Sequence, residues 1–100
     1  MTDLVEVMVK GDSMWPSFRD GDCVLFSPTI DGVEAGEVVL LRHPFKDLVM
    51  VKRIKHFNLD GSVFVVGDNP DPLASEDSHN FGAVRMDALM GRFVESVRRA

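Results

Sequence analysis

The chain has 100 residues, which suits one domain, and we expect a single domain over residues 1–100. Hydrophobic residues make up 45% of the sequence, enough for a packed core, and 27% are charged. The formal net charge of −5 argues against a nucleic-acid-binding module, which would have a basic surface, and against an anionic membrane surface as a partner.

Targeting and redox signals point to the cytoplasm. The single cysteine, Cys23, cannot form an internal disulfide and lies in an apolar run, so we expect it to be reduced and buried. The sequence begins Met-Thr-Asp, without a basic segment followed by an apolar one. No run approaches the ~20 apolar residues that span a bilayer. We therefore expect a cytoplasmic protein without a transmembrane anchor.

Short apolar runs separated by Gly, Pro, Asn and Asp predict strands, in chain order, over residues 4–10, 23–26, 37–42, 48–57 and 62–66. Residues 67–80 form a polar loop, long enough to be either functional or disordered. The tail over residues 86–97 is open: its apolar spacing suits a helix, but Gly91 interrupts it and residues 93–97 also fit a strand. The pattern predicts an all-β, mostly antiparallel barrel or sandwich-like domain with at most one short helix.

A rigid turn follows the first predicted strand, over residues 11–18 (Gly-Asp-Ser-Met-Trp-Pro-Ser-Phe). Glycine permits a sharp turn there and proline restricts the backbone that follows, so Ser13 would be held on a fixed elbow. A nucleophilic serine needs such presentation, but a turn or capping serine in a surface loop has the same residues. These eight residues alone do not decide between the two interpretations.

The fourth predicted strand carries a second candidate. With a period of two, Lys52 shares a face with Leu48, Met50 and Ile54, whereas Arg53 and Lys55 lie on the other face. Burial among apolar side chains would lower the pKa of the Lys52 ammonium group and make it a possible base. The alternative is that Lys52 extends along a partly buried edge to reach water.

Other chemistries have weaker support. A Ser/His/Asp triad could combine Ser13 with Asp68 or Asp77, but nothing selects one of the three histidines, and those at positions 43 and 56 resemble ordinary surface residues. Cysteine and histidine do not cluster as zinc ligands, the acidic loop does not follow the helix-loop-helix calcium pattern, and no phosphate-binding glycine loop occurs. We expect no metal and no cofactor.

Three segments in order resemble the sequence boxes of type I signal peptidases. Residues 13–18 resemble the Ser-Met-x-Pro-Thr-Leu box, residues 51–53 (Val-Lys-Arg) the Lys-Arg box, and residues 67–82 the Gly-Asp-Asn…Ser-x-Asp-Ser-Arg…Gly box. Residues 21–22 fit the Gly-Asp that follows the serine box. The resemblance covers most of the chain and implies a serine/lysine-dyad endopeptidase on a signal peptidase or LexA-type β fold.

The resemblance also implies roles. Ser13 would be the nucleophile, with its backbone N–H helping to hold the oxyanion, and Lys52 would be the general base. Ser75 would orient the lysine, while Asp68 and Asp77 would brace the loop. Substrate-binding residues would be Met14, Gly11 and Asp12.

The chain departs from the family pattern in several respects. We expect no membrane anchor, because Ser13 is close to the start, and no extended β region follows Lys52. The spacing before Ser75 is about two residues longer than the pattern, His79 replaces the usual arginine, and Gly11 replaces a hydroxyl donor found in some members. A short member of this kind most resembles the soluble nickel-type superoxide dismutase maturation proteases, which implies removal of an N-terminal peptide from a precursor polypeptide.

Two alternatives remain. One is the self-cleaving domain of LexA-like repressors, which also uses a serine/lysine dyad. The other is a non-catalytic peptide-binding module on the same fold, for which an exposed Trp15 beside the elbow would be suited.

Overall fold

The structure, a computed structural model, describes residues 3–100 and consists of one sheet with short helical turns. The strands are β1 (Val5–Met8), β2 (Cys23–Ser27), β3 (Val38–Arg42), β4 (Val49–Phe57), β5 (Val63–Val66) and β6 (Leu89–Arg98). The helical elements are the 3-10 turns η1 (Pro72–Ala74) and η2 (Met86–Ala88) and the α-helix α1 (Ser78–Phe81). The all-β prediction is confirmed.

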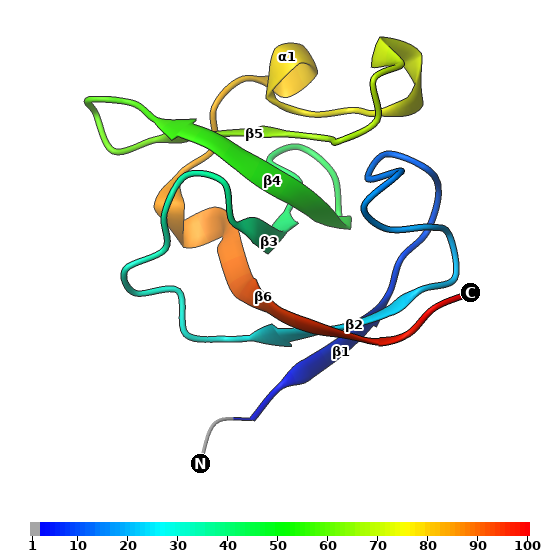
Figure 1. Cartoon of the computed structure of the whole chain (residues 1–100). Coiled ribbons are helices and arrows are strands. Elements are labelled where there is room, and N and C mark those ends of the chain that lie inside the picture. Colours follow the sequence, from blue (N-terminus) through cyan, green and yellow to red (C-terminus); the bar gives the residue numbers. More distant parts are fainter. Residues whose placement is uncertain (1–2) are drawn as a thin grey trace.

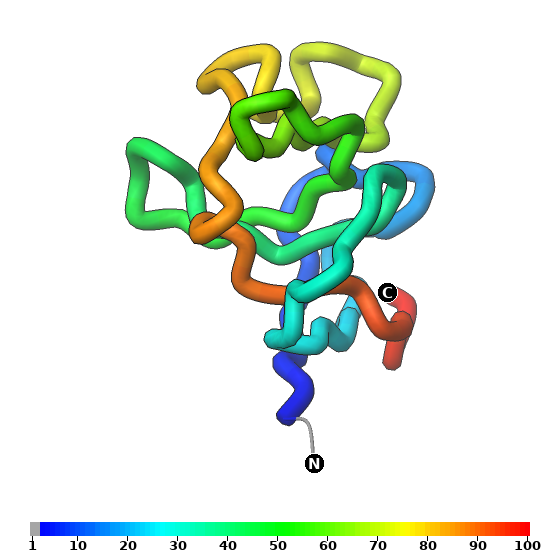
Figure 2. The backbone as a smooth tube through the Cα atoms, turned by 90° about the vertical axis from the view of Figure 1, so that its left-hand side faces the viewer, coloured from blue at the N-terminus to red at the C-terminus, as the bar shows by residue number. Residues whose placement is uncertain are grey.

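All strand pairs are antiparallel, and the order in the sheet is β1-β2-β6-β3-β4-β5. The last strand of the chain therefore lies between β2 and β3, where it joins the N-terminal hairpin to the rest of the sheet (Figure 1). β1 and β5 are the two edges. The perpendicular view shows that the backbone curves round and does not form a flat layer, which is consistent with the twist of antiparallel strands (Figure 2).

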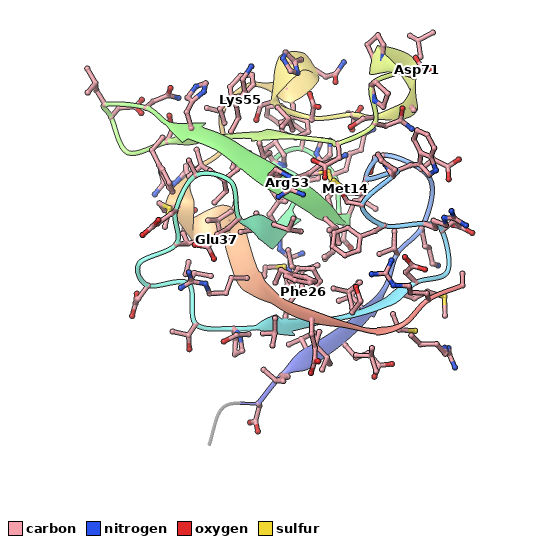
Figure 3. All side chains as sticks on the ribbon, viewed as in Figure 1. Met14, Phe26, Glu37, Arg53, Lys55 and Asp71 are labelled. Carbon is pink, nitrogen blue, oxygen red and sulfur yellow. The ribbon has the colours of Figure 1, made fainter. Side chains whose placement is uncertain are left out.

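β3 lies beside β6 at the centre of the sheet, and its continuous apolar sequence explains why. Val39 and Leu41 pack into one hydrophobic cluster with residues of β4 and β5, whereas Val38 and Leu40 pack into a second with Phe26 of β2. The two faces of β3 are therefore buried, which a run of Val and Leu without alternation favours. The second cluster includes Met14 of the serine elbow, and Figure 3 labels Met14 and Phe26 in the interior.

The structure settles the open points of the sequence analysis. Residues 89–98 of the tail form a strand, because Leu89 and Gly91 pair with β3 while later residues pair with β2. The first strand is shorter than predicted and ends at Met8. The predicted loop over residues 67–80 contains η1 and the start of α1. Cys23 is buried and Trp15 is 44% exposed, as expected. Among residues 3–100, no helix is long and apolar enough to cross a membrane.

Candidate active site

A groove of about 450 Å³ lies between β1 and the first half of β4 and holds both predicted dyad residues in its wall. Its lining is mostly apolar, with a few polar and charged groups. The lining residues are Val7, Met8, Val9, Lys10, Ser13, Met14, Leu48, Val49, Met50, Val51, Lys52 and Glu76. Strands that are far apart in the sheet order thus meet across one groove, because the sheet curls.

The elbow that carries Ser13 is built from local backbone bonds. Gly11 adopts a positive φ of 78° and donates its N–H to Asp20 Oδ1 at 2.7 Å, which closes the base of the loop. The Trp15 N–H donates to the Asp12 carbonyl oxygen at 3.1 Å, and Met14 is buried at 1% exposure. Ser13 is therefore presented on a fixed turn, with its neighbour Met14 anchored in the core.

Lys52 lies in the interior. It is 4% exposed, between Met50 and Ile54 on one face of β4, so the alternative in which it reaches water is wrong. Burial lowers the pKa of its ammonium group, and the negative charges of Asp77 and Glu76 offset only part of this effect. Its Nζ donates to Ser75 Oγ at 3.0 Å. This lysine thus loses its proton more readily than an exposed one.

Gly67 brings the serine elbow and Ser75 together. A Cβ atom at Gly67 would lie only 2.6 Å from the Ser13 carbonyl oxygen and would overlap the Ser75 hydroxyl. Ser13, which precedes Met14 on the elbow, and Ser75, which is bonded to Lys52, therefore approach the same backbone position from two segments. Only glycine permits this approach.

Asp77 connects this glycine to α1. Its Oδ2 accepts the Gly67 N–H at 3.0 Å, and its Oδ1 accepts the His79 N–H and contacts the His79 ring nitrogen Nδ1, both at 2.9 Å. Burial alone would raise the pKa of Asp77, but these hydrogen bonds outweigh it and lower the pKa. His79 thus contacts the aspartate that arginine would meet in the family pattern.

Asp68 lies in a second polar group. It accepts two hydrogen bonds from the Arg53 guanidinium, at 2.9 and 2.7 Å, and one from Ser17 Oγ at 2.6 Å. Burial raises the pKa of Asp68, but the Arg53 and Ser17 hydrogen bonds outweigh it and lower the pKa. Arg53 also donates to the Gly36 carbonyl oxygen at 2.7 Å, so the adjacent loop is held as well.

His43 differs from its expected place on the surface. It is 4% exposed, with Nε2 at 2.6 Å from Glu76 Oε1, and its Nδ1 accepts the backbone N–H groups of Phe45 and Lys46 at 3.0 and 3.2 Å. Since Nδ1 accepts, Nε2 carries the proton and donates to Glu76. His43 thereby holds the residue that follows Ser75. Its place in a turn before proline gave no signal of burial.

Only some of the predicted substrate-binding residues lie in the wall of the groove. Met14 lines the groove, whereas Gly11 and Asp12 are exposed and are not among its lining residues. The Asp12 carbonyl oxygen instead accepts a hydrogen bond from the side chain of Asn69, a residue to which the sequence analysis gave no role. In the part of the chain that the structure describes, no group of three or more His, Cys, Asp or Glu side chains is placed to hold a metal ion.

The antiparallel β fold, with a groove lined by a buried lysine and an elbow serine, is compatible with the class of peptidase-like domains. Residues 2–87 match the family described as Peptidase S24-like, and the chain belongs to this family. The match supports the resemblance at the level of the superfamily that joins LexA-like and signal peptidase-like domains. It does not distinguish the nickel-type maturation proteases within it. No curated protein matches the chain.

Proposed function

We infer that the protein is a serine endopeptidase in which Ser13 is the nucleophile and Lys52 the general base. The observation that carries this proposal is the burial of Lys52 in the wall of the same groove as Ser13. A buried lysine is costly for stability, and its lowered pKa is what a base at moderate pH requires. Ser75, bonded to Nζ, is the proposed lysine-orienting residue.

In the proposed reaction, neutral Lys52 takes the proton from Ser13 Oγ, and the oxygen attacks the peptide carbonyl carbon. The tetrahedral intermediate collapses as the C–N bond breaks, and Lys52 gives its proton to the leaving amine. Lys52 then takes a proton from water, which attacks the acyl ester, releases the carboxylate and restores the Ser13 hydroxyl. Within residues 3–100, the Ser13 N–H donates to no protein acceptor and is free to hold the oxyanion.

The substrate of this proposal is an extended peptide. Among the described residues 3–100, β1 pairs only with β2, and residues 49–52 of β4 pair only with β3, because pairing with β5 begins at Arg53. Each side of the groove therefore has unpaired backbone groups, which can bind a peptide as an additional strand. The apolar lining favours a substrate with apolar side chains beside the scissile bond.

Among polypeptide substrates, we propose a precursor that loses an N-terminal peptide, with the nickel superoxide dismutase precursor as the first to test. The resemblance in the sequence boxes supports this choice. The family match favours a second candidate, self-cleavage as in LexA-like domains.

The test incubates the purified protein alone, with the dismutase precursor, and with a peptide library derived from a proteome, and identifies new termini by mass spectrometry. We expect cleavage in trans, and its loss, by more than about 1000-fold, in Ser13→Ala and Lys52→Ala. Ser27→Ala and Lys55→Ala are matched controls, since Lys55 lies on the exposed face of β4. Loss of mass in the protein alone would instead indicate self-cleavage.

The pH dependence of kcat/KM tests the base. Since burial lowers the pKa of Lys52, the rate should rise with pH and reach half its maximum below the ordinary lysine value of about 10.4. Full activity in Lys52→Ala, or a rate that does not change across this range, would contradict the proposed dyad.

A further inference from the structure

We propose that Asn69 is a positioning residue that fixes the serine elbow; this inference rests on the proposed function. The backbone N–H of Asn69 donates to the Ser13 carbonyl oxygen at 3.0 Å. Its side-chain Nδ2 donates to the Asp12 carbonyl oxygen at 2.8 Å. One residue from the loop after β5 thus holds two successive carbonyl groups of the elbow, one of them that of the proposed nucleophile.

Both polar atoms of the Asn69 side-chain amide make hydrogen bonds. Its Oδ1 accepts the Asp71 N–H at 2.9 Å, while Nδ2 points to the Asp12 carbonyl oxygen. The neighbours determine the orientation of the amide, because a backbone N–H can only donate and a carbonyl oxygen only accept. Aspartate would keep the bond to Asp71 but could not donate to Asp12, so the position needs an amide.

The loop that contains Asn69 also holds the other end of the elbow and the proposed base. Asp68 accepts the Ser17 hydroxyl at 2.6 Å, and Ser75 accepts the Lys52 Nζ at 3.0 Å. The views in Figures 1 and 2 agree that the elbow, in blue, lies beside the yellow-green loop. Residues 67–77 therefore form one segment that is hydrogen-bonded both to the elbow and to the proposed base. Within this segment, Asn69 is the residue that bonds to the carbonyl oxygens of Ser13 and Asp12.

This position should affect the rate more than substrate binding. Asn69 does not line the groove, so its loss leaves the substrate contacts in place. A small displacement of a reacting group can reduce a rate by up to roughly 100-fold. We therefore expect Asn69→Ala and Asn69→Asp to lower kcat by roughly 10- to 100-fold, with KM within about twofold of the wild type.

The matched control is Asn58→Ala together with Asn58→Asp. Asn58 lies in the turn of the β4–β5 hairpin and donates its Nδ2 to Ser62 Oγ at 2.9 Å, so the same chemical change is made away from the groove. These variants should keep the wild-type kcat. In Asn69→Ala, which adds no charge, the midpoint of the pH profile should be unchanged, because the surroundings of Lys52 are retained.

A readout independent of catalysis is amide hydrogen exchange in the elbow. The Trp15 N–H donates to the same Asp12 carbonyl oxygen that Asn69 holds. Its exchange should accelerate by about tenfold in both Asn69 variants and not in the Asn58 variants. Unchanged exchange, or a kcat within twofold of wild type in both Asn69 variants, would overturn the inference. If the wild-type protein cleaves no peptide but exchange accelerates, the proposed function fails while the fixing of the elbow stands.

Discussion

At the scale of single residues, the burial of Lys52 favours the proposed chemistry but lowers the stability of the folded protein. An ammonium group buried between Met50 and Ile54 loses its hydration, and the hydrogen bond to Ser75 replaces only part of that hydration. Between the lowered folded pKa and the ordinary unfolded pKa, the unfolded state binds more protons, so the stability contribution of Lys52 improves as the pH rises through that window. Below that window the full cost of burying the charged amine is present.

This conflict predicts that Lys52→Met stabilises the protein while removing its proposed activity. Methionine has a similar length, packs among apolar neighbours and carries no charge, so the free energy of unfolding at pH 7 should increase by about 1 kcal/mol. Urea unfolding measures this change, with Lys55→Met on the exposed face of the strand as the control. A clear loss of stability in Lys52→Met would show that the lysine contacts contribute more than burial costs.

At the scale of elements, the loop over residues 67–77 joins segments that are distant in the sequence. Gly67 contacts the serine elbow, Asp77 caps α1 and accepts the Gly67 N–H, and Asp68 pairs with Arg53 of β4. These contacts make an otherwise irregular loop a fixed support. Its length in so small a chain is explained by the number of partners that it reaches.

The same crowding predicts the effect of Gly67→Ala. The new methyl group would push against the Ser13 carbonyl oxygen and the Ser75 hydroxyl, and the backbone oxygen cannot easily move aside. We expect a loss of about 2 kcal/mol in the free energy of unfolding and a loss of kcat beyond what unfolding explains.

The matched control for this substitution is Gly91→Ala. A Cβ at Gly91 would lie 2.9 Å from the Ser27 carbonyl oxygen and 3.1 Å from Phe26 Cβ, within the β2–β6 contact. It should lower stability similarly but keep the kcat of the folded fraction. Equal effects of the two substitutions on kcat would indicate that Gly67 has no special relation to the groove.

The elements could be predicted from the sequence more fully than the site could. Alternation and turn residues indicated the strands, and the period of two placed Lys52 on the buried face of β4. The strand order could not be predicted, because nothing local shows that β6 inserts between β2 and β3. For the same reason the burial of His43 and the bonds of Asn69 to the serine elbow were missed, because they depend on partners more than thirty residues away in the chain.

At the scale of the whole molecule, paired carboxylates hold separate parts of the structure together. Asp68 links β4 to the elbow, Asp77 links the loop to α1, and Glu37 accepts hydrogen bonds of 2.9 and 2.6 Å from Arg92 of β6. For each of the three, burial raises the pKa, but hydrogen bonds outweigh it, so the folded pKa lies below the ordinary value.

These shifts predict that the protein loses stability in acid. A carboxylate with a lowered folded pKa contributes stability above its unfolded pKa of about 4, and this contribution disappears as the pH falls through the folded value. The midpoint of urea unfolding should therefore decrease as the pH falls below about 5, with the largest changes below about 4. A midpoint that stays constant from pH 7 to pH 3 would contradict this account.

Asp68→Asn shows how much of this acid sensitivity comes from one pair. At pH 7 the variant should lose about 2 kcal/mol, because Arg53 keeps its charge beside a neutral partner and its side chain is only 35% exposed. At pH 3 the difference from the wild type should become smaller, because this pH lies below the ordinary aspartate pKa of about 3.9, where proton uptake by the unfolded wild type removes part of the stability that the carboxylate contributes. Asp47→Asn, which removes the 99% exposed partner of Arg42, should change stability little at either pH. A difference between Asp68→Asn and the wild type that is as large at pH 3 as at pH 7 would mean that the substitution acts through packing, and that the charge of Asp68 does not link β4 to the serine elbow.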